Sequence, residues 1–125
     1  MDWHDNSIYA IEFRENSELL IDIDYIIQWV AKGKIFKFWV APATLIFKNV
    51  YDLKLESGGT DLIIMGIIRD NPQQPKNKNY IIEPFEYDWL IETTNGEISF
   101  KSVGYEQYLR KDPILSNTQK IGRKD

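Results

Sequence analysis

The residues with the clearest chemical potential are Trp3, His4 and Asp5, and His4 is the only histidine of the chain. A histidine paired with a carboxylate can act as a general base near neutral pH, and it can orient a nucleophile such as Ser7. Neighbouring side chains of an extended segment point to opposite sides, so the triplet need not assemble. The simpler interpretation is structural, with Trp3 closing one end of the core. His4 and Asp5 are thus the candidates for catalysis, and no established catalytic residue is assigned.

Five further carboxylates are candidates for binding a partner. Asp22 and Asp24 are two positions apart in a predicted strand and share one of its faces, while Glu86, Asp88 and Glu92 share the polar side of another. All five are predicted to lie on solvated outer faces. An acidic face of this kind is suited to docking a protein with a basic surface.

The composition limits which metal, cofactor and phosphate-binding sites the chain can form. With one histidine and no cysteine, the chain can form no disulfide, iron–sulfur cluster or cysteine-based zinc site, so we predict no metal and no cofactor. Gly58-Gly59 stands alone, outside the glycine pattern of a phosphate-binding loop.

The charge distribution argues against nucleic acid as a partner. Residues 1–109 contain 10 basic and 17 acidic groups, whereas residues 110–125 contain five basic and two acidic groups. Nucleic-acid binding requires clustered lysine and arginine, which an acidic body does not offer. Apolar runs such as residues 62–68 are too short to span a bilayer, and the first residues are polar. We therefore expect a cytoplasmic protein without membrane contact.

Alternation of apolar and polar residues predicts the elements that position these groups. Residues 7–14 and 18–26 are predicted to form a hairpin, although residues 26–31 also suit a short helical turn. Residues 43–56 carry the cleanest alternation, with Leu45, Phe47 and Leu53 facing inward. Pro42 marks a strand start, an edge or a bulge, and Gly66 marks a bulge.

The dipeptide Asn95-Gly96 predicts a two-residue hairpin loop, which would place Thr94 opposite Glu97 and Trp89 opposite Ser102. The whole pattern predicts a single, mainly β domain over residues 1–112, an antiparallel meander with little helix. It would form a curved sheet, a sandwich or an open barrel, followed by a polar, basic and solvated tail over residues 113–125.

Three short stretches carry a resemblance: residues 3–8, the step Ile23-Asp24-Tyr25, and residues 38–45. They resemble small β-rich bacterial proteins that open with an aromatic-His-Asp triplet, some of which are immunity proteins of toxin systems. The resemblance implies a compact β-rich domain and carries over no catalytic residues.

Three functions are consistent with these observations. The first is a non-enzymatic protein-binding module of the immunity type, which needs only a rigid β scaffold, an acidic face and mobile loops. The second is a carrier of a small apolar ligand inside the curved sheet. The third is an enzyme that depends on His4. Exposed strand edges also leave room for a homodimer.

Overall fold

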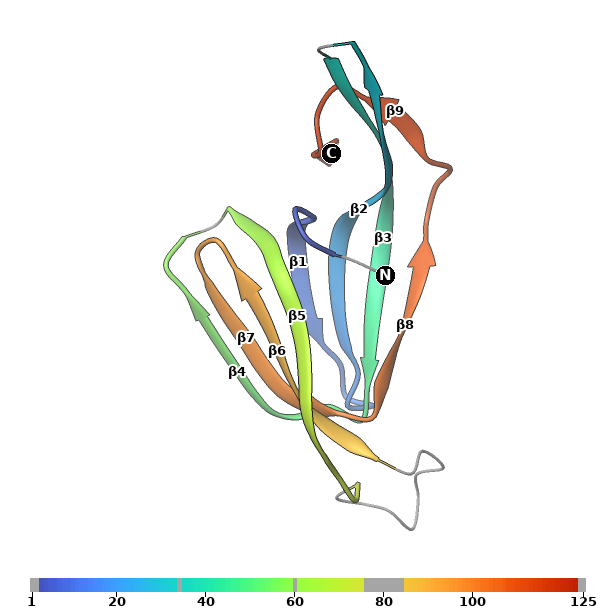
Figure 1. The fold of residues 1–125 in the computed structure, drawn as a ribbon. Coiled ribbons are helices and arrows are strands. Elements are labelled where there is room, and N and C mark those ends of the chain that lie inside the picture. The colour runs from blue at the N-terminus through green and yellow to red at the C-terminus, as the bar shows by residue number, and fades with distance from the viewer. Residues whose placement is uncertain (1–2, 34, 60, 76–84, 124–125) are drawn as a thin grey trace.

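The computed structural model describes residues 3–33, 35–59, 61–75 and 85–123. Within them the chain forms nine β-strands and no helix (Figure 1). The strands are β1 (Ser7–Phe13), β2 (Leu19–Lys32), β3 (Ile35–Lys48), β4 (Tyr51–Ser57), β5 (Leu62–Gln73), β6 (Glu86–Thr93), β7 (Gly96–Ser102), β8 (Gly104–Leu109) and β9 (Ile114–Ser116). The predicted mainly β, antiparallel class is confirmed. None of the described residues belongs to a helix with the length and apolarity to cross a membrane.

The strands form one open sheet in the order β4-β7-β6-β5-β1-β2-β3-β8, with β9 paired to β3. Only Ser7↔Ile63 and Ile8↔Leu62 join β1 to β5, and the sheet folds over at this junction. Its two halves, β4-β7-β6-β5 and β1-β2-β3-β8, therefore face each other (Figure 1). The connections from β3 to β4 and from β7 to β8 cross between the halves.

Aromatic rings fill the space between the two halves. The ring of Phe47 on β3 lies 5.1 Å from that of Trp89 and 4.7 Å from that of Phe100, both on the opposite half. Leu45 and Phe47 are buried and Leu53 packs against the same cluster, as the alternation predicts. The predicted single strand over residues 43–56 is wrong in one respect, because the chain leaves β3 after Lys48 and crosses to the other half before β4 begins.

The hairpin of β6 and β7 differs from the prediction in its register. Thr93 pairs with Gly96, Ile91 with Ile98 and Trp89 with Phe100, so the loop is Thr94-Asn95. This register places apolar side chains opposite each other on the core face, which outweighs the turn preference of Asn-Gly. The predicted bulge at Gly66 is confirmed by a register shift between Ile64 and Gly66.

β2 and β3 extend beyond the rest of the sheet as a two-stranded ribbon, described over residues 26–33 and 35–40 (Figure 1). β1 pairs with β2 only as far as Ile23, whereas β3 pairs with β2 up to Lys32↔Ile35. The alternative of a helical turn over residues 26–31 is thus wrong. On its β3 side the ribbon is flanked by β9, from Phe38↔Ser116 to Val40↔Ile114.

Candidate functional site

Asp24 is fully buried although it lies on the outer face of β2, and a distant part of the chain covers it. One carboxylate oxygen, Oδ2, accepts hydrogen bonds from the Tyr9 hydroxyl at 2.5 Å and from the backbone N–H groups of Ile121 at 2.8 Å and Gly122 at 3.3 Å. The other, Oδ1, accepts one from Nη1 of Arg123 at 2.5 Å. The expectation of a solvated face is therefore wrong for Asp24.

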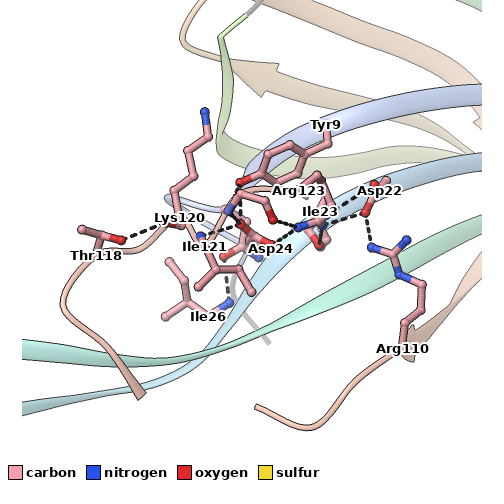
Figure 2. A network of polar contacts seen from close by, with 12 residues as sticks. Tyr9, Asp22, Ile23, Asp24, Ile26, Arg110, Thr118, Lys120, Ile121 and Arg123 are labelled. Atoms are coloured by element: carbon pink, nitrogen blue, oxygen red, sulfur yellow. Dashed lines mark hydrogen bonds and ion pairs between the residues drawn. The ribbon is translucent and has the colours of Figure 1, made fainter. Parts of the chain in front are cut away.

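The guanidinium group of Arg123 is held from several directions (Figure 2). Its Nη2 donates to Asp22 Oδ1 at 2.7 Å and to the carbonyl oxygen of Ile23 at 2.9 Å, and its Nε donates to Asp22 Oδ2 at 3.2 Å. Its central carbon lies 4.0 Å from the centroid of the Tyr9 ring, as in a cation–π contact. We call Tyr9, Asp22 and Asp24 the guanidinium site.

The electrostatics of this site follow from burial and pairing. Burial and the hydrogen bond to Asp24 raise the pKa of the Tyr9 hydroxyl, because a phenolate beside a buried carboxylate is disfavoured. Burial by itself lowers the pKa of Arg123, but hydrogen bonds to Asp22 and Asp24 outweigh it and raise the pKa. Arg110 forms a second ion pair with Asp22.

Pro42 helps to explain how the C-terminal residues reach this site. Along the outer edge of β3, β8 pairs with residues 43–48 and β9 with residues 38–40. Pro42 lies in the gap between them, where its missing N–H leaves no ladder bond unmade. The carbonyl oxygen of Pro42 accepts a hydrogen bond from the Arg110 N–H at 2.8 Å, where the chain leaves β8.

Residues 117–123, which we call the C-terminal segment, then run from β9 to the guanidinium site. The tail predicted to be solvated is thus bound to the body over residues 114–123.

The carboxylates predicted on the other half of the sheet do not form one open acidic face. Glu86 is fully buried and accepts a hydrogen bond from the Tyr51 hydroxyl, so its predicted exposure is wrong. Asp88 accepts hydrogen bonds from Asn71, Gln73 and Lys101, and those from Asn71 and Lys101 lower its pKa. Glu92 is half-buried, opposite Glu97 on β7. A partner-binding role for these residues stays a prediction.

The side chains of His4 and Asp5 are in contact, because the chain turns at Asp5 and does not continue as an extended strand. Asp5 adopts a left-handed backbone conformation with φ of 69°, and Nδ1 of His4 lies 3.0 Å from Asp5 Oδ2. Gln119 of the C-terminal segment donates to the same oxygen at 3.3 Å. Both side chains are about half exposed, whereas Ser7 is buried at 3% exposure in β1. The buried serine does not offer its hydroxyl to a solvent-borne substrate, so the serine nucleophile is not supported.

Trp3 takes the structural role that the sequence suggests. It packs against the core cluster, its ring lies edge-on to Tyr105 at 5.2 Å, and its indole N–H donates to Gln107 at 2.8 Å. Among the described residues, no three histidine or acidic side chains gather to hold a metal ion.

The ribbon carries an exposed apolar surface that sequence reasoning missed. Its large apolar side chains are between 38% and 65% exposed: Ile27, Trp29, Ile35, Phe36 and Trp39. The rings of Trp29 and Phe36 lie 5.7 Å apart across the two strands. The signal in the sequence is residues 26–40 themselves, which hold three lysines and no acidic residue in a chain of net charge −4.

Two hollows lie beside the C-terminal segment. One of about 620 Å³ is lined by ribbon residues with His4, Asp5 and Gln119. The other, of about 450 Å³, is lined by residues 121–123 together with Pro42, Arg110 and Ile114. No family model, no curated protein and no solved structure matches this chain.

Proposed function

We propose that this chain is a non-enzymatic protein-binding module whose docking surface is the ribbon. The observation that carries the proposal is the row of large apolar side chains that the ribbon exposes, led by Trp29 at 65% and Ile35 at 60%. Exposed apolar surface of this kind marks interaction sites in soluble proteins, and aromatic side chains dominate the binding energy of such sites.

The ribbon also offers backbone groups to a partner. β1 pairs with one edge of β2 only as far as Ile23. Beyond Ile23, no strand among the described residues pairs with this edge, although the Ile26 N–H donates a hydrogen bond to the Asn6 side chain at 3.2 Å. An extended segment of a partner can pair with such an edge. The open edge and the aromatic side chains therefore lie on one element.

Charge selects the partner. Residues 26–40 carry lysines without acidic residues, so a docking patch that is apolar at its centre and acidic at its rim is complementary to the ribbon. The basic partner predicted from the carboxylates does not fit this surface. An immunity-type role, with a toxin protein as the partner, is the specific form that the resemblance of residues 3–8 and 38–45 implies.

The packing of the interior disfavours the second predicted function. Phe47, Trp89 and Phe100 are in contact between the two halves of the sheet, where an apolar ligand of a carrier would have to lie. A His4-dependent enzyme has the His4–Asp5 pair in its favour, but the serine predicted as its nucleophile, Ser7, is buried.

The test compares three forms of the full chain as baits in the cells that make it. We expect a protein retained by the wild type to be lost by Trp29→Ser/Phe36→Ser and kept by Leu55→Ser, which alters an equally exposed apolar residue on β4. The purified pair should then bind more weakly as salt increases, because the ribbon is basic. Equal loss in the Leu55 control, or retention of nucleic acid in place of an acidic protein, would overturn the proposal.

A further inference from the structure

We infer that the guanidinium site is a recognition site for an arginine-bearing polypeptide segment, which the C-terminal segment occupies in cis and which a segment of another protein can take over. This inference goes beyond the proposed function, since the site and the ribbon are different surfaces. It concerns Tyr9, Asp22 and Asp24, the last of them fully buried.

The geometry selects arginine over lysine. Asp22 receives Nη2 at 2.7 Å on one oxygen and Nε at 3.2 Å on the other, which is the forked pairing that only a guanidinium group can make. Asp24 and the Ile23 carbonyl oxygen take further N–H groups, and the Tyr9 ring covers the planar face at 4.0 Å. An ammonium group has neither the fork nor the flat face.

The site also contacts the backbone before the arginine. Asp24 Oδ2 accepts the N–H groups of Ile121 and Gly122, and the Gly122 N–H lies 3.0 Å from the Tyr9 hydroxyl oxygen. Gly122 has a φ of 77°, in the left-handed region that favours glycine. The recognised motif is therefore any residue, then glycine, then arginine.

The occupant is suited to exchange because its contacts lie mainly at this site. Away from it, Asn117 and Thr118 are exposed, Gln119 donates to Asp5, and Lys120 forms one solvent-exposed ion pair with Asp61 at 3.6 Å. The hollow of about 450 Å³ is lined by residues 121–123 and leaves room beside the segment for a longer polypeptide.

Displacement requires an incoming arginine rather than simple opening. Without a cation, the buried carboxylate of Asp24 would lose its ion pair, which is strongly unfavourable. A tethered segment acts as a ligand at an effective concentration on the order of millimolar, so weak ligands bind only when the resident arginine is removed.

The test uses the full chain with Arg123→Ala and an acetylated, amidated peptide copying residues 120–124, Lys-Ile-Gly-Arg-Lys. We expect this variant to bind the peptide at least about tenfold more tightly than the wild type in calorimetry. A peptide with lysine in place of the arginine should bind at least about tenfold more weakly. Adding Asp24→Asn to Arg123→Ala should abolish binding. The control variant Lys111→Ala, which removes a nearby exposed cation, should bind the peptide as weakly as the wild type.

Equal binding of the arginine and lysine peptides, or no effect of Asp24→Asn, would overturn the inference. If Arg123→Ala does not fold, the wild-type chain is titrated with millimolar peptide while the side-chain Nε–H signal of Arg123 is followed by NMR. Movement of that signal to the position of a free arginine supports exchange, and an unmoved signal refutes it. Trp29→Ser/Phe36→Ser should bind the peptide unchanged in the Arg123→Ala background, so failure here leaves the ribbon proposal standing.

Discussion

At the scale of single residues, burial decides what each carboxylate does. Asp24 and Glu86 occupy positions that alternate like surface residues, yet both are fully buried and accept a tyrosine hydroxyl. A buried carboxylate persists only where hydrogen bonds or a cation replace the water it has lost. For Asp24 these partners come from β1 and the C-terminal segment, and the cation is Arg123.

The raised pKa of Tyr9 gives a prediction about alkaline pH. A phenol whose pKa is higher in the folded than in the unfolded chain contributes stability that is complete below the unfolded value, about 10, and is lost as the pH rises toward the folded value. The difference between the near-ultraviolet pH titration curves of the wild type and of Tyr9→Phe should therefore show a tyrosine that ionises well above pH 10. Urea unfolding should show less loss of stability above pH 10 for Tyr9→Phe than for the wild type.

A control is needed because the hydrogen bond to Glu106 raises the pKa of Tyr108 as well. Tyr108→Phe should leave the titration of Tyr9 unchanged. If the wild type and Tyr9→Phe differ only by a phenol that titrates near pH 10, the contact between Tyr9 and Asp24 does not persist in solution.

At the scale of elements, the close approach of β4 explains the glycine at the start of β7. Gly96 begins β7 with φ of 142° beside the backbone of Glu56 on β4. The Thr93 hydroxyl donates to the Gly96 carbonyl oxygen at 2.7 Å and closes the loop from the other side. The glycine is thus needed because β4 packs closely against the start of β7.

Gly96→Ala should destabilise the protein by about 3 kcal/mol or more, because the added Cβ would lie 1.9 Å from the Glu56 carbonyl oxygen. The matched control is Gly66→Ala, where no atom lies within 4 Å of the added Cβ, and its effect should stay within about 1 kcal/mol. Urea denaturation measures both. Similar losses for the two variants would contradict the approach of β4 to Gly96.

At the scale of the whole molecule, side-chain packing rather than backbone pairing holds the folded sheet closed. β1 and β5 share only a short ladder, whereas Phe47 contacts rings on β6, β7 and β8. The core and the ribbon should therefore respond very differently to the loss of an aromatic ring.

Phe47→Ala should lower the free energy of unfolding by about 3–5 kcal/mol, since it removes a fully buried ring at the junction of both halves. Phe36→Ala, at 50% exposure on the ribbon, should cost less than about 1 kcal/mol. Thermal and urea unfolding of the two variants provide the comparison. A loss at Phe36 as large as that at Phe47 would mean that the ribbon is part of the core.

The amino-acid sequence by itself determined the class of the fold and most strand positions. Residue type placed Trp3 against the core and the bulge at Gly66. Period-two alternation is a local signal, and it correctly placed Leu45 and Phe47 inside. It also placed Asp22 and Asp24 on the outer face of β2, although it assigned that face to solvent.

Only the tertiary structure decided what covers that face. Asp24 is buried because Arg123, 99 positions later in the chain, folds back and binds its carboxylate. No local sequence pattern indicates a contact between residues that far apart. The same holds for Glu86 under Tyr51, and for the ribbon, which extends because β1 ends while β2 and β3 continue. Local alternation specifies which side of a strand is apolar, whereas the burial of its other side depends on which distant segment the folded chain brings there.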